Sequence, residues 1–482
     1  MSVLDAITEF RQATPDQLLL GNGEQSLSFA EFDSRRLEAG AALAAAGIRR
    51  DDLVAIYSND VIEFFVTLFG IWSIGAVAVP LNTRIPESAL RDVIEQTGLK
   101  QIVGEAPYAI DGVERIDMAV HSAESLPGRS EEVAPEATAI IMFTSGSTGR
   151  PKGVAQTMAA VSANAALTAA AIRLASDDRI FVNTPPCFTS SICHFLTLLS
   201  VGGSYVGVGG FHFGDDTLEL IERFGCTGFG GAPAHLKRII EPLVEAREIG
   251  NLRFWVSSGD HLPAALIEKF ARVLPRVQLC YMYGLTEVSG RLCINPDATD
   301  GEPLGTVGTA IGEMRISVRR EDGSKALAEE SGEIYVEGPL LCDGYYRAPD
   351  ATRESFTSHG FRTRDFGHLD ARGDLWVEGR LDDILKVGGE KVSTIAVTQA
   401  VSALEGVTEA AVLVVDDATI GKALVAFAVT DETRAPTKAA MIRTLRSRLP
   451  VNAIPKRIEI VDSIPRTGSG KVDRKALAHH LS

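Results

Sequence analysis

Short apolar runs alternate along most of this chain with longer segments in which Ala and Leu recur at helical spacing. Strand–helix alternation of this kind is typical of doubly wound α/β structure. A chain of 482 residues also holds ample material for a sizeable core. We therefore expect a large α/β body. Its candidate strands are residues 53–57, 101–103, 179–182, 204–208 and 254–256, and its clearest candidate helices are residues 31–46 and 159–174.

The pattern changes twice toward the carboxyl end. From about residue 306, Gly and Asp turns separate short strand candidates, which predicts a mostly antiparallel, β-rich subdomain. After residue 380, helix and strand patterns return and predict a small α+β unit. We expect an amino-terminal domain of residues 1–380 and a carboxyl-terminal domain of residues 381–482, with the boundary in the Asp- and Gly-rich segment 381–390.

Charge and cysteine usage exclude several classes of protein. The net charge of −16 argues against a protein that coats nucleic acid or anionic lipid, although it leaves room for an anionic small substrate. The six cysteines show no Cys-x-x-Cys pair, so we expect buried, reduced thiols in a cytoplasmic protein. The start of the chain lacks a basic segment followed by an apolar run, so we expect no secretory signal there.

One apolar run resembles a membrane span in length. Residues 64–81 carry no charge, which places them at the threshold for a span, but Gly70, Gly75 and Pro80 interrupt the run. We predict instead a buried helix at 61–74, a break at Gly75 and a short buried strand at 76–79, and no membrane span.

The strongest chemical signal is the segment 141–154, IMFTSGSTGRPKGV. An apolar strand leads into glycines, which let the backbone approach a ligand, and into hydroxyls and one lysine, which suit phosphate oxygens. The segment is not a Walker P-loop, because Pro151 stands where that pattern needs Gly before Lys152. The loop 467–471 fails the same test, since Pro465 occupies the first glycine position.

At these residues the chain resembles the adenylate-forming superfamily, which includes acyl-CoA synthetases, adenylation domains of peptide synthetases and firefly-type luciferases. Further segments match that superfamily in the expected order over nearly the whole chain. They are Tyr283-Gly284-Leu285-Thr286-Glu287, Gly332-Glu333-Ile334, Gly344-Tyr345-Tyr346, Thr363-Arg364-Asp365, the crossover 379–386 and the lysine loop 465–471.

The resemblance implies attack of a carboxylate on the α-phosphate of ATP, release of pyrophosphate, and transfer of the acyl group to a thiol. It also implies a role for each matching residue. Lys471 would bridge the carboxylate and the α-phosphate, Thr286 would bind that phosphate, and Glu287 would hold Mg²⁺. The remaining nucleotide-binding candidates are Thr144, Ser145, Gly146, Ser147, Thr148, Lys152, Gly259, Asp260, Tyr283, Gly284, Asp365 and Arg380.

The resemblance further implies a hinge and a thiol channel. Asp382 would be the hinge about which the small domain rotates between the half-reactions, and Gly388 and Gly389 would let the arm of CoA pass close to the backbone. The chain departs from the superfamily pattern at three places: Arg364 replaces a glycine, Thr189 stands where a His or aromatic gate is common, and segment 393–396 lacks a Pro and a Glu.

Amino-acid adenylation domains commonly place an Asp near Phe188, yet the stretch 187–195 has no acidic residue. The sequence therefore favours an acid without an α-amino group, small to medium and largely apolar or aromatic. His194 and Arg291 could meet a second polar group, but a satisfied core histidine and a solvated arginine are the more common arrangements. The predicted acyl-pocket residues are Phe188, Thr189, His194, Phe229, Gly231, Met282 and Val288.

Three hypotheses follow. The leading one is an acid:CoA ligase that uses ATP, Mg²⁺ and CoA. The second is a stand-alone adenylating enzyme that loads a carrier-protein phosphopantetheine or an amine. The third, a non-catalytic homologue, is disfavoured because Lys471, Glu287, Thr286 and Asp365 are all present. The sequence leaves the oligomeric state open, with a homodimer as one option.

Overall fold

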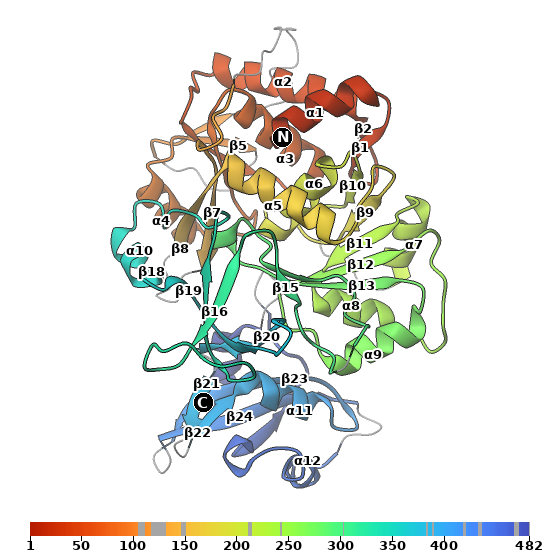
Figure 1. Cartoon of the computed structure of the whole chain (residues 1–482), viewed down its shortest axis with the longest axis vertical. Coiled ribbons are helices and arrows are strands. Elements are labelled where there is room, and N and C mark those ends of the chain that lie inside the picture. Colours follow the sequence, from red (N-terminus) through yellow and green to blue (C-terminus); the bar gives the residue numbers. More distant parts are fainter. Residues whose placement is uncertain are drawn as a thin grey trace. The chain divides into compact units, whose positions relative to one another are not determined.

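The computed structural model describes residues 1–104, 111–116, 132–145, 151–210, 215–241, 243–301, 303–381, 384–387, 390–417, 421–431, 436–466 and 472–481. Its contacts divide the chain into two compact units. The first comprises Met1–Ile316 and Val336–Phe361, and the second comprises Ser317–Tyr335 and Arg362–Ser482. Figure 1 shows the elements of each unit in chain order.

The first unit contains a six-stranded sheet that is parallel except for its last strand. Strand β8 runs antiparallel to β7 and forms a hairpin with it. In spatial order the strands are β6 (Glu114–Ile116), β5 (Gln101–Gly104), β3 (Leu53–Tyr57), β4 (Val77–Pro80), β7 (Thr138–Ser145) and β8 (Pro151–Thr157).

A nine-stranded sheet in the same unit has a parallel centre and antiparallel strands at both edges. In spatial order it comprises β15 (Thr309–Ala310), β14 (Cys293–Asn295), β13 (Gln278–Tyr283), β12 (Phe254–Ser258), β11 (Gly228–Gly231), β9 (Arg179–Val182), β10 (Ser204–Gly207), β1 (Leu18–Gly21) and β2 (Ser26–Ser28).

Two helices lie between these sheets: α5 (Met158–Ala171) packs on β7 and β8, α6 (Thr189–Leu199) packs on β9 and β10, and the two helices pack on each other. This layered arrangement confirms the predicted doubly wound α/β body (Figure 1). The other helices of the unit are α1 (Val3–Ala13), α2 (Phe29–Ala45), α3 (Val61–Ser73), α4 (Glu87–Thr97), α7 (Asp215–Arg223), α8 (Pro233–Ile240), α9 (Ala264–Val273) and α10 (Pro349–Ser355).

The apolar run at 64–81 forms the predicted helix, break and strand. Asp60 caps the start of α3, since its side chain accepts a hydrogen bond from the Glu63 amide. Gly75 then adopts a φ of +72°, which turns the chain into β4. Both elements are buried, and no helix among the described residues is long and apolar enough to cross a membrane.

An aromatic cluster forms the centre of this core. Phe65 of α3 stacks on Phe195 of α6 with ring centroids 4.1 Å apart, and Phe32, Phe69 and Tyr205 pack around them. These rings join three helices and one strand that are far apart in sequence. All six cysteines are buried and unbonded, as expected of reduced thiols. Burial raises the pKa of the Cys187 and Cys280 thiols to about 12.

A five-stranded sheet with antiparallel pairs β18–β19 and β19–β20 accounts for the predicted β-rich segment. Its strands are β16 (Arg315–Arg319), β17 (Gly332–Glu337), β18 (Phe356–Thr357), β19 (Gly360–Leu369) and β20 (Leu375–Arg380). The carboxyl-terminal segment contains both helices and strands, as expected of an α+β unit: β21 (Ile384–Val387), β22 (Glu390–Ser393), α11 (Thr394–Ser402), β23 (Val407–Asp417), β24 (Gly421–Thr430), α12 (Lys438–Leu445), β25 (Arg457–Ile460) and α13 (Arg474–Ala478). Of these, β21, β22 and α13 were not predicted.

Trp72 fastens α3 to β7, because its buried indole N–H donates a 2.7 Å hydrogen bond to the Ala139 carbonyl. We predict that Trp72→Phe lowers the free energy of unfolding of this unit by about 2 kcal/mol, through loss of the bond and of packing volume. Thermal melting in parallel with Trp376→Phe provides the control, since Trp376 is only half-buried. Equal melting temperatures for the two variants would contradict this role of Trp72.

Candidate active site

The hairpin of β7 and β8 presents two of the predicted phosphate-binding residues. Thr144 lies opposite Lys152 in the strand register, and its hydroxyl donates to the Lys152 carbonyl at 3.4 Å. The Lys152 ammonium lies 5.1 Å from the centroid of the Tyr345 ring, a cation–π contact. The hairpin therefore holds a positive charge beside an aromatic side chain of a distant segment.

The loop between β13 and β14 carries Thr286 and Glu287. It closes tightly: the Leu292 amide donates to the Tyr283 carbonyl at 2.9 Å, and the Gly290 amide donates to the Leu285 carbonyl at 3.1 Å. A Cβ on Gly284 would lie 1.6 Å from the Gly290 carbonyl oxygen, so the loop requires glycine there. Gly284 thus has a packing role in addition to its predicted place in the nucleotide site.

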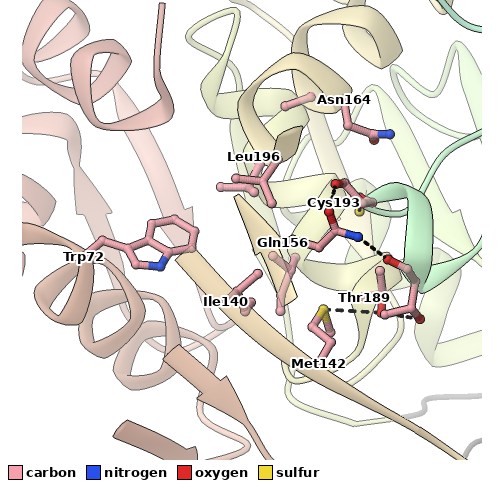
Figure 2. A pocket seen from close by; sticks show the side chains of 13 residues that line it. Trp72, Ile140, Met142, Gln156, Asn164, Thr189, Cys193 and Leu196 are labelled. Atoms are coloured by element: carbon pink, nitrogen blue, oxygen red, sulfur yellow. Dashed lines mark hydrogen bonds between the residues drawn. The ribbon is translucent and has the colours of Figure 1, made fainter. Parts of the chain in front are cut away.

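Two buried amide side chains anchor this loop (Figure 2). Gln156 of β8 donates to the Thr286 carbonyl at 2.8 Å and accepts from the Ser289 hydroxyl at 2.6 Å. Asn164 of α5 donates to the carbonyls of Val288 and Arg291, at 3.1 and 2.7 Å. The loop therefore depends on hydrogen bonds from elements that pack on the other sheet.

Glu287 has a defined partner. Its carboxylate accepts a 2.8 Å hydrogen bond from the Tyr345 hydroxyl. Burial and the neighbouring Glu287 charge raise the pKa of Tyr345 above its usual range, so the phenol stays protonated and remains a donor. The same ring contacts Lys152, so Tyr345 links the cation of the hairpin to the carboxylate of the loop.

Thr189 begins α6 beside the loop. Its hydroxyl lies 3.4 Å from the Thr286 hydroxyl and donates to the Met142 sulfur at 3.4 Å. Below them lies a small, mostly apolar cavity of about 20 Å³, room for about one water molecule. Trp72, Ile140 and Leu196 are among the residues that line it (Figure 2). The structure thus places a small hydroxyl where the resemblance suggested a gating side chain.

The carboxyl end of β12 leads into the predicted adenine-binding loop. Gly259 adopts a φ of +94° and faces open space, and the exposed Asp260 carboxylate accepts from the His261 amide at 2.8 Å. Tyr281 supports the loop from β13, since its hydroxyl accepts from the Leu262 amide at 3.1 Å. Tyr283 is half-buried at the end of the same strand.

The predicted acyl-pocket residues lie on both faces of the nine-stranded sheet. Phe229 stacks on Trp255 and Phe181, and a Cβ on Gly231 would meet the Phe229 ring, so both belong to one face. His194 faces Gly230 on the other side. Met282 pairs with Ser258 in the register, Val288 is fully buried in the loop, and Phe188 caps α6.

The expectation that Arg291 is solvated is wrong. Its side chain is buried, with 4% exposure, because the tight loop turns it inward beneath Asn164. One terminal nitrogen donates to the Ser258 hydroxyl at 3.1 Å, and the other lies 3.3 Å from His194 Nε2. This contact could not be predicted from local sequence, since Arg291 lies 33 positions from Ser258 and 97 from His194.

The second unit holds the predicted ribose-binding pair. Asp365 of β19 lies opposite Arg380 of β20 in the register, and their side chains form an ion pair at 3.3 Å. Asp365 is buried, with 4% exposure, and its amide donates to the Thr363 hydroxyl at 3.0 Å. Arg364 has a φ of +61°, the left-handed conformation that glycine adopts more readily.

Several predictions concern residues outside the described part of the chain. They include the catalytic lysine, the hinge, the two glycines of the thiol channel and most of the phosphate loop. These residues are Lys471, Asp382, Gly388, Gly389, Gly146, Ser147 and Thr148, and Ser145 is described only in its backbone.

The sequence matches the AMP-binding enzyme family over residues 7–346, and its AMP-binding enzyme C-terminal domain over residues 396–471. The chain belongs to the AMP-binding enzyme family. It is 27% identical to the long-chain-fatty-acid–CoA ligase FadD13 of Mycobacterium tuberculosis, over 95% of this chain and 93% of that protein. It is 28% identical to the 2-succinylbenzoate–CoA ligase of Geobacillus kaustophilus, over 96% and 95%.

The fold resembles that of the o-succinylbenzoate CoA synthetase MenE of Bacillus subtilis, solved with its acyl-adenylate intermediate. The TM-score is 0.88 at 26% identity, with 98% of this chain and 97% of that chain covered. The same synthetase has been solved with ATP and a magnesium ion. These similarities confirm the predictions of the adenylate-forming superfamily, of an AMP-forming acid:CoA ligase, and of ATP, Mg²⁺ and CoA as its small-molecule requirements.

Three residues of this site were not among the sequence predictions. Gln156 and Asn164 carry no local signal, because an amide in a strand or helix is usually solvated. Tyr345 was noted only as part of a Gly-Tyr-Tyr segment, and nothing in the sequence connects it to Glu287, which lies 58 positions away.

We predict that Gln156→Glu lowers kcat about tenfold, because the variant loses the donor to the Thr286 carbonyl and adds a charge beneath the loop. Acid-dependent pyrophosphate release gives kcat, and thermal melting reports folding. Gln25→Glu is the matched control, since it makes the same change at an exposed position of the first unit. An unchanged kcat in a folded Gln156→Glu enzyme would contradict the anchoring role.

Proposed function

We propose that this chain converts a carboxylic acid without an α-amino group to its CoA thioester in two steps. In the first, a carboxylate oxygen attacks the α-phosphorus of ATP, the bond to the β-phosphate breaks, and pyrophosphate leaves. In the second, the sulfur of CoA attacks the acyl carbon, the thiol proton is lost, and AMP leaves. The observation that carries the proposal is the anchored loop, which holds Thr286 beside Thr189 and Glu287 on Tyr345.

The first step brings two anions together, so it needs local positive charge and donors within an acidic protein. Thr144, Thr286 and Lys152 supply donors and a cation from the described part of the site. We assign the bridge between carboxylate and α-phosphate to Lys471, and the ribose contacts to Asp365 and Arg380. Support for Lys471 comes from its Pro-Arg-Thr-Gly-x-Gly-Lys context.

Glu287 suits a magnesium ion. No group of three or more His, Cys, Asp or Glu residues in the described part of the chain is arranged to hold a metal. Mg²⁺ is commonly bound by one or two carboxylates together with substrate phosphates. Glu287 would be that carboxylate, and Tyr345 would orient it through the 2.8 Å hydrogen bond. The ion would neutralise charge that develops on the phosphates.

The acceptor is proposed to be CoA, and transfer to a carrier-protein phosphopantetheine or an amine is the alternative. Rotation of residues 381–482 about Asp382 would exchange the adenylation arrangement for the thiol-transfer arrangement, with Gly388 and Gly389 beside the thiol arm. The six unbonded cysteines support a cytoplasmic location. A homodimer remains an option for the assembly.

A panel of carboxylic acids, scored for AMP formation with and without CoA and by mass spectrometry of the product, tests the proposal. We expect AMP formation that depends on acid and Mg²⁺, and a CoA thioester as product. Lys471→Ala should abolish adenylation yet retain thiol transfer from a supplied acyl-adenylate. Full ATP-dependent activity in that variant would defeat the assignment of Lys471, and discharge by carrier protein or amine but not CoA would favour the alternative.

We predict that Tyr345→Phe raises the Mg²⁺ concentration required for half-maximal pyrophosphate release about tenfold, because Glu287 loses the hydroxyl that orients it. The measurement is a magnesium titration at saturating ATP and acid. Tyr335→Phe is the control, since it removes the same hydroxyl from a tyrosine that donates to Glu333. A titration curve identical to the wild type would contradict the role of Tyr345.

A further inference from the structure

Within the part of the chain that the structure describes, the buried guanidinium of Arg291 lacks an acidic partner. Among the described residues no Asp or Glu forms an ion pair with it, and its hydrogen-bond partners are the Ser258 hydroxyl and the His194 ring. Arg36 shows the contrast: it is also buried, at 3% exposure, and it pairs with Asp33 at 2.6 Å. An uncompensated buried cation is costly, so it is uncommon unless something else supplies the negative charge.

The two titratable side chains described next to Arg291, His194 and Cys193, supply no negative charge either. Burial, reinforced by the Arg291 charge, keeps the pKa of His194 well below its usual value, so the ring is neutral at neutral pH. Since a guanidinium can only donate, His194 Nε2 is the acceptor of that contact and the ring proton lies on Nδ1. The Cys193 thiol nearby also stays protonated, because burial raises its pKa.

The surroundings are built to bring these groups together. Gly230 of β11 makes room for the His194 ring, because a Cβ there would lie 2.7 Å from Nε2. Asn164 holds the Arg291 backbone through two hydrogen bonds, of 2.7 and 3.4 Å, and the Val288 carbonyl through a third, of 3.1 Å. These hydrogen bonds use only backbone atoms of residue 291, so they would form with an uncharged side chain at that position as well. The loop fold alone therefore does not account for an arginine at this position.

We propose that Arg291, held in place by Ser258 and His194, binds a second carboxylate of the substrate acid, at the end remote from the carboxylate that is activated. The inference rests on the proposed acid activation and names the class of acid. A planar guanidinium matches a carboxylate through paired N–H donors, and the buried setting strengthens that bond. The substrate is then a dicarboxylic acid with an apolar spacer, which is more specific than the sequence-based expectation of a largely apolar or aromatic acid.

The helix α6 sets the span of such an acid. Thr189, beside Thr286, and His194, beside Arg291, are five residues apart on α6, about 7.5 Å along its axis. An extended chain advances about 3.5 Å for every three bonds. Five residues also turn α6 through about 140°, so the two places lie further apart than this axial rise. About six bonds between the two carboxyl carbons, as in pimelate, are therefore the least that would bridge them.

The test compares diacids with monoacids of the same carbon number: glutarate with valerate, pimelate with heptanoate, and azelate with nonanoate. The kcat/KM for acid-dependent AMP formation is measured for the wild type and for Arg291→Met, which keeps an unbranched apolar stem and removes the charge and the N–H donors. We expect the wild type to favour pimelate over heptanoate at least tenfold. In Arg291→Met, kcat/KM for pimelate should fall about 100-fold while that for heptanoate changes less than about threefold.

Arg36→Met is the matched control, because it removes an equally buried arginine whose partner Asp33 keeps a second ion pair with Arg11. It should lower thermal stability and leave the diacid-to-monoacid ratio unchanged. If Arg291→Met does not fold, Arg291→Lys keeps the charge without the planar fork and should lower the ratio about tenfold. The ratio of kcat/KM for pimelate to kcat/KM for heptanoate in the wild type also tests the proposal by itself.

A wild-type preference for the monoacid at every length, or an equal loss of both acids in Arg291→Met, would overturn the proposal. Failure of the proposed function gives a different result: no acid of either class yields AMP. In that case thermal melting decides, since protection by pimelate in the wild type but not in Arg291→Met supports the carboxylate site. Absence of such protection contradicts the site as well.

Discussion

The site of this enzyme depends on hydrogen bonds from Gln156 and Asn164 to one short loop. The loop belongs to the nine-stranded sheet, whereas β8 and α5, which supply the two amides, belong to or pack on the six-stranded sheet. Buried backbone carbonyls need partners, and these amides supply them where no regular secondary structure can. The position of Thr286 and Glu287 is therefore determined by how the two sheets of the first unit pack together.

Much of the fold could be predicted from local pattern. Apolar runs gave β3, α3 and β4 with the break at Gly75, because burial and a positive φ act within a few residues. Strand β11 was missed, since its sequence Gly-Phe-Gly-Gly has little strand propensity and is held by its parallel neighbours β9 and β12. Tertiary pairing, which a single sequence does not display, decided the structure of that segment.

Candidate site residues could be proposed from the sequence where a suitable residue type stands within a recognisable motif, as at Thr144, Lys152, Thr286 and Glu287. They could not be proposed where an ordinary residue acquires its role from distant contacts. Tyr345 gains its role from Glu287, and Arg291 from Ser258 and His194. A charged side chain is usually solvated, so the sequence alone favoured exposure of Arg291, and only the packing of a tight loop beneath Asn164 reversed that expectation.

The net charge of −16 is compatible with anionic substrates, because a few cations inside the protein can bind them. An acidic surface tolerates anionic substrates when cations are shielded from bulk solvent and from competing carboxylates. Lys152 beside the Tyr345 ring and Arg291 beneath the loop are two such cations, and neither forms an ion pair among the described residues. Because Glu287 and Arg291 lie on one anchored loop, the backbone fixes the separation between these two residues. For the proposed dicarboxylic acid, the hydrogen bonds that anchor this loop would thus also set the distance between its two binding places.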